Sequence, residues 1–504
     1  MSDRTSFEVI VLGGGPAGTA AATLLARRSH EVVPVSPASH PAGKLAESIP
    51  PSARRLLSEL EVLEAVEAAG FYANTGNTVW WADADARGER FGTKEPGFHV
   101  DRVGLERVLV AAAESCGVRL LLGMLARAAV QSEDGWSVTC EGANGETLEL
   151  RAPWLIDATG RHGLLARDVR EPDRSTTTLA LLRRFRRPGG WGDEVLGQTL
   201  IESYEDGWGW SVPLSSETRC VTAMIDQRHA ELSGVDVGAM LETELAKTRH
   251  LGALLEGATP EDEGWACPAS LYCASQYARP GLVLAGDAGS CIDPLSSYGV
   301  KKALASGWLA GVTAHTALID PPMTEVAVDF FDTREREVYR SYRRRAAEFF
   351  EEAAAAYGHI YWATRAQAAR TAGGERDGLD VDRLEALDGP PVSEQDVRTA
   401  FERIRARESL GAVRGSTVRP IERAAIAHQR IVLEQHLATD QHPEGIRFLR
   451  SVDLRTMSEL APEHDQVPEL WSAYNGVEAP VPLPDFLTAL ATAFAAGLLE
   501  HRKD

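Results

Sequence analysis

The chain has 504 residues, and its 52 basic and 73 acidic side chains give a formal charge of −21. Such an acidic balance disfavours a nucleic-acid partner or an anionic membrane surface. The six cysteines form no CxxC pair and no histidine cluster accompanies them, which argues against a disulfide framework and against a metal site. No signal peptide precedes the first apolar segment, and no apolar run reaches the roughly 20 residues of a spanning helix. We therefore expect a cytoplasmic protein.

A nucleotide-binding pattern opens the chain. Residues 7–12 (FEVIVL) are typical of a buried parallel strand, and GGGPAG and an Ala/Leu-rich helix follow them. Gly13, Gly15 and Gly18 match G-x-G-x-x-G, in which glycines allow a tight turn, approach of a pyrophosphate and close helix packing. The helix N-terminus would supply N–H groups to the phosphates. With a second strand at 31–35, this order predicts dinucleotide binding.

The residue after the second strand departs from the usual pattern. An acid commonly stands there and binds ribose hydroxyls, whereas this chain has Ser36. A serine hydroxyl would make a weaker, neutral hydrogen bond. We expect either reduced affinity on the adenosine side or a substitute residue.

Two later strand ends extend the pattern. Residues 154–163 (WLIDATGRHG) form an apolar strand with an Ala-Thr-Gly turn, and 281–285 (GLVLA) runs into Gly286-Asp287-Ala288. An acid beside a helix N-terminus would hold polyol hydroxyls, although it would equally cap a helix. One extended ligand would span both nucleotide-type turns, and FAD, with its ribityl polyol, is long enough to do so.

In this order GGGPAG, DATG and GDA resemble the FAD-binding core of the aromatic-hydroxylase class of flavoproteins. The resemblance implies that Asp287 binds the ribityl chain and that Arg102, in the segment HVDR, lies near the cofactor. It also implies that reduced flavin reacts with O2 as co-substrate.

A strand-rich segment follows between Arg170 and Pro280. Stretches such as QTLIESY and RCVTAMI, separated by polar or Gly turns, predict an antiparallel sheet, the usual substrate domain of this class. The hairpin at 78–92 is expected to join it. Trp208 and Trp210 match the W-x-W-x-x-P signature of flavin-dependent halogenases, and on a strand they point to one face. We interpret them as an active-site wall, with two core tryptophans as the alternative.

The segment KLAESIPPS resembles the ES-x-x-P loop that lies beside the flavin in the same family. Glu47 and Ser48 are the residues carried over from that loop, and Ala46 stands where the family has glycine.

Two departures argue against a simple halogenase. The stretch 70–81, where tryptophan halogenases carry a catalytic lysine, contains none, and Ala73 or Asn74 occupies the position. The halide loop of the type P-x-x-S-T-G is represented by Pro294–Gly299, in which Tyr298 replaces a small hydroxyl residue. Its bulk would fill a halide-sized space. A flavin C4a-hydroperoxide would then deliver oxygen itself.

The combined motifs resemble halogenase-like FAD monooxygenases over roughly residues 7–345. They are closest to the flavoproteins that hydroxylate tryptophan when quinone cofactors mature. We therefore predict an FAD-dependent monooxygenase acting on an indole- or phenol-like group of a small molecule, a carrier-bound substrate or a peptide. The alternatives are a flavin-dependent halogenase, a flavin reductase or dehydrogenase, and an FAD-bound partner protein. NAD(P)H or a separate flavin reductase would supply electrons.

Lys301 and Lys302 follow the flavin loop. They are interpreted as covering the polar side of a helix start, with a catalytic role as the alternative. The predicted catalytic or pocket residues are Trp208, Trp210, Tyr298 and Glu47. The predicted cofactor-binding residues are Gly13, Gly15, Ala17, Gly18, Ser36, Ser48, Arg102, Gly286, Asp287, Pro294, Gly299 and Val300.

The expected fold class is α/β, with a Rossmann-type FAD-binding domain, an inserted antiparallel-sheet substrate domain and an α-helical C-terminal region. We assign residues 1–75, 98–170 and 280–320 to the first and 76–97 and 171–279 to the second. The helical region is 321–504, with a linker near 371–391 and a helical run from Glu394 to Ala438.

Overall fold

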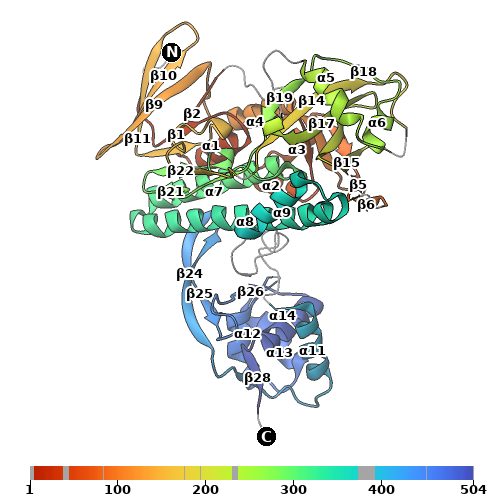
Figure 1. Ribbon diagram of the computed structural model, residues 1–504. Helices are drawn as coiled ribbons and strands as arrows, with labels where there is room; N and C mark the ends of the chain where they lie inside the picture. The colour runs from red at the N-terminus through yellow and green to blue at the C-terminus, as the bar shows by residue number, and fades with distance from the viewer. Residues whose placement is uncertain are drawn as a thin grey trace. The chain divides into compact units, whose positions relative to one another are not determined.

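The chain folds into two compact units, residues 1–378 and 379–504 (Figure 1). The predicted linker lies almost wholly outside the described residues. The computed structural model describes residues 5–37, 45–82, 85–92, 94–174, 176–192, 195–229, 236–372, 392–449 and 451–502.

The first unit is built on a largely parallel sheet with the strand order β21-β22-β12-β1-β2-β8. The apolar strand β1 is fully buried and pairs in parallel with β12 and β2. This arrangement confirms the Rossmann-type fold. The strands are β1 (Val9–Leu12), β2 (Val32–Ser36), β8 (Leu121–Leu122), β12 (Trp154–Asp157), β21 (Ala278–Arg279) and β22 (Leu282–Leu284), and the helices that follow the motifs are α1 (Pro16–Arg27), α4 (Arg102–Ser115) and α7 (Gly299–Ile319).

Helices α1 and α7 pack at backbone distance. A Cβ placed on Gly307 of α7 would lie 2.0 Å from the carbonyl oxygen of Ala17 in α1, and one on Gly18 would lie 1.9 Å from the carbonyl oxygen of Gly13. Only glycine fits at either position. The first contact joins the middle of α7 to the first turn of α1, and the second closes the glycine-rich turn against the start of α1.

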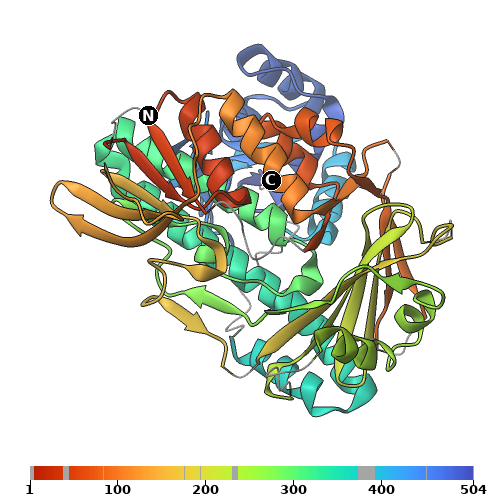
Figure 2. The same cartoon turned by 90° about the horizontal axis from the view of Figure 1, so that it is seen from above.

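A second sheet has eight strands and is mostly antiparallel. An antiparallel sheet is what the sequence predicts for the inserted domain. The expected hairpin is β5–β6, and it joins this sheet because β5 pairs with β15, although in parallel. Figure 2 shows the yellow-to-green strands of this sheet beside the parallel sheet. The strands are β5 (Gly76–Trp80), β6 (Arg87–Arg90), β14 (Thr178–Arg186), β15 (Gln198–Tyr204), β16 (Gly207–Pro213), β17 (Thr218–Asp226), β18 (Thr259–Pro260) and β19 (Trp265–Pro268).

Smaller elements complete the first unit. Strands β3 (Ala46–Ile49), β7 (Gly97–Asp101) and β4 (Tyr72–Asn74) form one sheet, β9 (Met124–Ser132), β10 (Gly135–Gly142) and β11 (Thr147–Ala152) another, and β13 (Arg170–Pro172) pairs with β20 (Tyr272–Ala274). The remaining helices are α2 (Ala53–Glu59), α3 (Leu63–Ala68), α5 (Val237–Leu245), α6 (His250–Leu254), α8 (Thr324–Tyr357) and α9 (Ile360–Ala372).

The second unit contains strands as well as the expected helices. The predicted helical run from Glu394 ends at Arg405, and the rest of it is wrong: β24 (Arg419–Ala427) and β25 (Arg430–Ala438) form a hairpin. His428 and Gln429 turn the chain with φ of 51° and 59°. A two-residue turn of this kind usually carries Asn-Gly or Asp-Gly, so the hairpin signal was weak in sequence.

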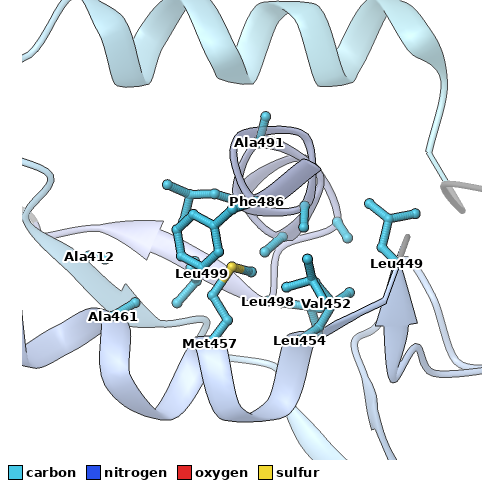
Figure 3. Close-up of a cluster of buried hydrophobic side chains, with 14 of the residues drawn as sticks. Ala412, Leu449, Val452, Leu454, Met457, Ala461, Phe486, Ala491, Leu498 and Leu499 are labelled. Carbon is cyan, nitrogen blue, oxygen red and sulfur yellow. The ribbon is translucent and has the colours of Figure 1, made fainter. Parts of the chain in front are cut away.

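The core of this unit is apolar and draws on its helices and its last strand. Figure 3 shows Phe486 and Met457 turned into the same cluster beside Leu498. The other elements are β23 (Ala412–Arg414), β26 (Phe448–Leu449), β27 (Val452–Asp453), α12 (Leu454–Leu460), α13 (Val467–Val477), α14 (Leu483–Ala495) and β28 (Leu499–His501).

Within the described residues, no helix has the length and hydrophobicity needed to cross a membrane. The same residues hold no cluster of three or more His, Cys, Asp or Glu side chains suited to a metal ion.

The α1–α7 contact predicts a large effect of one methyl group. We expect Gly307→Ala to lower the free energy of unfolding of the first unit by about 1–3 kcal/mol, because the helices must move apart. Gly92→Ala is the control, since its Cβ meets nothing within 4 Å. Urea unfolding of both variants measures the difference, and equal midpoints would contradict the close packing.

Candidate active site

The start of α1 has the features of a phosphate site. Gly15 precedes the helix without a side-chain cap, and the first turn carries no acidic residue. A Cβ on Gly13 would lie 2.3 Å from the carbonyl oxygen of Ala158, whereas one on Gly15 would find only the Oε1 atom of Glu106, at 3.7 Å. The glycine-rich turn is therefore packed tightly against the backbone at Gly13, whereas the space beside Gly15 is open. Its uncapped N–H groups fit an anionic pyrophosphate.

Arg102 lies beside this turn, at the start of α4. Its guanidinium contacts the carboxylate of Glu47 at 3.0 Å and that of Glu106 at 2.9 Å. Burial raises the pKa of Glu47 above its usual range, and Arg102 opposes this shift. The structure thus brings the ES-x-x-P loop and the HVDR segment together.

The Gly286-Asp287-Ala288 turn is held by its backbone, which leaves the Asp287 carboxylate accessible. Tyr272 donates its hydroxyl to the carbonyl oxygen of Asp287 at 2.7 Å, and Arg170 donates to the same oxygen at 2.9 Å. The Asp287 side chain remains 33% exposed. An accessible carboxylate at this position fits the hydroxyls of a ribityl chain.

Lys302 is not on a polar helix face, so that interpretation was wrong for this residue. Its side chain is 1% exposed, and its Nζ donates to the carbonyl oxygens of Gly286, at 2.9 Å, and Ser290. The Nζ atom also lies 3.7 Å from Oδ1 of Asp287. Burying this cation is compensated by the two carbonyls and the carboxylate. Lys302 therefore holds the GDA turn against α7.

Lys301 is half-buried and contacts both the residue before α2 and the flavin loop. Its Nζ donates to the Ser52 hydroxyl at 2.8 Å and lies 5.1 Å from the centre of the Tyr298 ring.

Sequence reasoning missed Arg161, which follows the DATG turn. Its charge lowers the pKa of Glu47, whereas Asp287 raises it. Charged groups from three segments far apart in sequence therefore act on the same carboxylate. An arginine directly after a glycine turn at a strand end was the available signal.

The flavin loop Pro294–Gly299 brings Tyr298 against α8. The Tyr298 ring centre lies 5.4 Å from that of Tyr342, and Ser297 before it adopts φ of 54°. Gly299 is exposed, and a Cβ there would meet nothing within 4 Å, while Val300 is buried. The loop is thus packed against α8 at Tyr298, whereas the space beside Gly299, at the start of α7, is free of other atoms of the described residues.

The two tryptophans of the W-x-W-x-x-P strand differ in surroundings. Trp208 is 2% exposed and packs in a core cluster with Trp81 and Trp362. Trp210 is half-buried and meets Trp208 edge to face, with ring centres 5.8 Å apart. Only Trp210 keeps the accessible surface that a pocket wall requires.

Ser48 belongs to a buried polar network. Its hydroxyl lies 2.8 Å from that of Thr199 and accepts from Asn74 at 3.0 Å, and His99 Nε2 lies 2.9 Å from the same Thr199 hydroxyl. Burial, with the nearby Arg219 charge, lowers the pKa of His99 to about 3.

Ser36 is the last residue of β2 and lies next to the glycine-rich turn. A Cβ placed on Gly14 would lie 2.9 Å from both the Cβ and the Oγ of Ser36.

Residues 6–305 match the FAD binding domain family. The chain belongs to this family. FAD is therefore its cofactor, and the glycine cradle and the accessible Asp287 carboxylate fit it. The match covers the parallel sheet, both glycine-rich turns and the inserted sheet.

Curated relatives are flavin-dependent halogenases. A tryptophan 2-halogenase of Chondromyces crocatus is 31% identical over 350 residues, 65% of this chain and 64% of that protein. The halogenase rdc2 of Metacordyceps chlamydosporia is 27% identical over 63% and 66%. The chain thus spans slightly less than two thirds of the length of these two proteins. The resemblance to halogenase-like flavoproteins is confirmed.

Solved structures extend the likeness of fold to the second unit. The flavin-dependent halogenase CmlS has a TM-score of 0.77 at 21% identity, covering 99% of this chain and 96% of its own. The peptidyl tryptophan dihydroxylase QhpG has a TM-score of 0.64 at 21% identity, with 93% and 95% covered.

We expect Lys302→Met to weaken FAD binding about tenfold, because the GDA turn loses the cation that joins two carbonyls and Asp287. Flavin fluorescence titration measures the dissociation constant. Lys301→Met, whose side chain does not reach the turn, should stay within about twofold of the wild type. Equal constants for all three proteins would show that Lys302 does not position the turn.

The buried His99 predicts acid sensitivity. Its pKa falls from 6.5 to about 3 on folding, so between these values the unfolded chain binds a proton that the folded chain does not. Protonation therefore favours unfolding, and this stability is present above pH 6.5 and is lost as the pH falls. The loss is about 2 kcal/mol between pH 6.5 and 5. Urea unfolding should show a shallower pH dependence for His99→Gln; identical slopes would contradict the assignment.

Proposed function

We propose that the protein is an FAD-dependent monooxygenase that hydroxylates an indole- or phenol-like group. The observation that carries the proposal is the flavin loop, where the Tyr298 ring packs on Tyr342 in place of a small residue before Gly299. A tyrosine ring at this position would fill a halide-sized space. The absence of any lysine in 70–81 supports the same conclusion.

The roles of the chain's residues follow from their positions. The N–H groups at the start of α1 would hold the pyrophosphate, and Asp287 would accept hydrogen bonds from the ribityl hydroxyls. Bound FAD supplies the redox chemistry with O2. Val300 lies at the start of α7, whose positive end would face an anionic ring edge.

Three further residues would act on the substrate side. Trp210 and Tyr298 would wall the pocket and exclude water. Glu47, with its raised pKa and its Arg102 partner, is the group best suited to hold a proton near the ring. An electron donor, either NAD(P)H or a separate reductase, remains a prediction from the resemblance.

A flavin-dependent halogenase is the second candidate, because the curated relatives carry that name at up to 31% identity. It would require a lysine from outside 70–81 and a halide site beside Tyr298. The neighbour QhpG, described as acting on peptidyl tryptophan, supports including peptides among the substrates to be tested.

Product mass separates these functions. The holoenzyme with reduced FAD and O2 is incubated with tryptophan, a tryptophan-containing peptide and a phenol, with and without chloride or bromide. We expect a mass gain of one oxygen atom that does not depend on halide. A halide-dependent gain would establish the halogenase instead. Flavin turnover without any modified product would indicate a reductase or dehydrogenase, and no substrate-dependent turnover would indicate a partner protein.

Tyr298→Thr tests the loop directly. Removing the ring should open space for an anion, so bromide should quench flavin fluorescence in the variant and not in the wild type. Tyr342→Phe is the matched control, because it retains the ring that packs on Tyr298. Quenching that is unchanged in Tyr298→Thr would show that the ring does not occupy a halide position.

A further inference from the structure

A continuous series of aromatic rings connects the inserted sheet with helices α8 and α9. The distances between successive ring centres are 5.8, 6.3, 5.4 and 6.3 Å in the order Trp210, Trp208, Trp81, Trp362 and Tyr357. We call these five residues the ring series. Indole and phenol rings lose an electron more easily than the ring of phenylalanine, and the series contains no phenylalanine.

The two ends of the ring series are accessible, whereas its middle is not. Trp210 and Tyr357 are half-buried, and the three tryptophans between them are at most 2% exposed. Trp210 is the residue that we assign to the wall of the pocket, and Tyr357 is the last residue of α8. Aromatic packing in the core explains the buried rings. It does not explain why easily oxidised rings join the proposed pocket wall to a half-buried tyrosine.

The polar atoms along the ring series suit the passage of positive charge. The Nε1 of Trp81 donates to the carbonyl oxygen of Phe349 at 2.8 Å, and the Nε1 of Trp362 donates to that of Tyr204 at 2.9 Å. Loss of an electron makes an indole N–H a stronger acid, so its hydrogen bond to a carbonyl strengthens. The two carbonyls therefore stabilise the oxidised form of the buried rings.

The ring series has a branch at Trp362, where Tyr361 lies closer than Tyr357, with ring centres 4.8 Å apart. The guanidinium of Arg365 lies 3.6 Å from the centre of the Tyr361 ring, and a cation there opposes the loss of an electron. Burial also raises the pKa of the Tyr361 hydroxyl, which opposes the loss of its proton. Tyr357 is half-buried, so its proton can pass to water. The series therefore ends at Tyr357.

We propose that the ring series conducts oxidising equivalents from the active site to the protein surface. This proposal rests on the proposed function, because that function places Trp210 at the wall of the pocket where O2 reacts. Such a path would protect the site from oxygen-centred radicals that O2 activation releases when no substrate is hydroxylated.

The electrons and protons balance as follows. A hydroxyl radical in the pocket takes one electron from Trp210 and one proton from water, and it leaves as a water molecule. Each ring is then reduced by the next ring in the series, until Tyr357 loses one electron and its phenolic proton passes to water. A small reductant in solution, ascorbate or a thiol, returns a hydrogen atom to Tyr357.

Spin trapping tests the path without turnover. Under blue light Trp210 would give an electron to excited FAD, so the full-length, FAD-loaded protein is illuminated under argon with a nitroso spin trap. Peptide mass spectrometry then locates the adducts. We expect an adduct on Tyr357 in the wild type and its loss in Trp81→Phe and Trp362→Phe. Trp471→Phe is the control, because this residue lies on α13, outside the ring series.

Two conservative tyrosine variants test the end of the path, and circular dichroism confirms their folding. Tyr357→Phe keeps the ring and removes the hydroxyl, so the adduct at this position should disappear. Tyr361→Phe should keep the adduct on Tyr357. A wild-type protein with its adduct on Tyr361, or an adduct on Tyr357 that persists in both Trp81→Phe and Trp362→Phe, would overturn the proposal.

Trp208→Phe separates a failure of the path from a failure of the pocket assignment. This variant interrupts the ring series directly behind Trp210, so the adduct should move to Trp210. An adduct on neither Trp210 nor Tyr357 would contradict the pocket-wall position and the path with it. Adducts on Tyr357 at the wild-type level would overturn the path alone. Product mass still decides between hydroxylation and halogenation.

Inactivation during turnover tests the protective role. With reduced FAD and O2 but no substrate, Trp362→Phe should accumulate oxidised Trp210 and lose activity faster than the wild type. Ascorbate should slow the inactivation of the wild type more than that of the variant, since only the wild type connects the pocket to Tyr357. Equal half-lives, with equal oxidation of Trp210, would contradict protection by the ring series.

Discussion

The backbone contact between α1 and α7 is the constraint on which the cofactor site depends. Ala17 belongs to the first glycine-rich turn, and Gly307 lies on the helix that follows the flavin loop. Because a side chain at Gly307 would collide with the Ala17 carbonyl, the two helices can meet only where both are small. That meeting brings together the two turns that we propose for the pyrophosphate and the ribityl chain of FAD.

A second set of contacts then fixes the GDA turn to α7. The Gly286 N–H donates to the Ser306 hydroxyl at 2.8 Å, and its carbonyl oxygen accepts from Lys302 at 2.9 Å. Glu335 of α8 is buried, and the charge of Lys302 opposes the rise in its pKa that burial causes. The buried Lys302 thus interacts with the accessible carboxylate of Asp287 and with the buried carboxylate of Glu335. The cost of burying it is offset by bonds that also orient Asp287.

The sequence predicted those parts of the site that lie within one short segment of the chain. The strand-turn-helix at 7–27 and the strand before Asp287 were readable because period, turn glycines and helix onset agree within one short segment. The W-x-W segment was predicted to be a strand, and it forms β16. Sequence favoured a pocket wall for Trp208 over a core position, because the neighbours that bury it, Trp81 and Trp362, come from distant segments. The cofactor and the halogenase-like family were likewise predicted from these motifs.

What could not be predicted depends on tertiary contacts. Nothing near Lys302 in the chain indicates burial, because its partners at 286 and 290 approach only after α7 packs. The sequence predicts a helix where the hairpin β24–β25 forms, because the turn at His428 and Gln429 lacks the usual glycine. Arg161 reaches Glu47 and Asp287 only through the folded sheet.

The most direct test of the account is FAD binding by a chain in which the close contact between Gly18 and the carbonyl oxygen of Gly13, within the glycine-rich turn, is disturbed. Flavin fluorescence titration of Gly18→Val against the wild type and Gly92→Ala measures it, with circular dichroism to confirm folding. The account predicts one FAD per chain in the wild type and the control, and none in Gly18→Val. Equal binding by a folded Gly18→Val variant would contradict the claim that this cradle holds the cofactor.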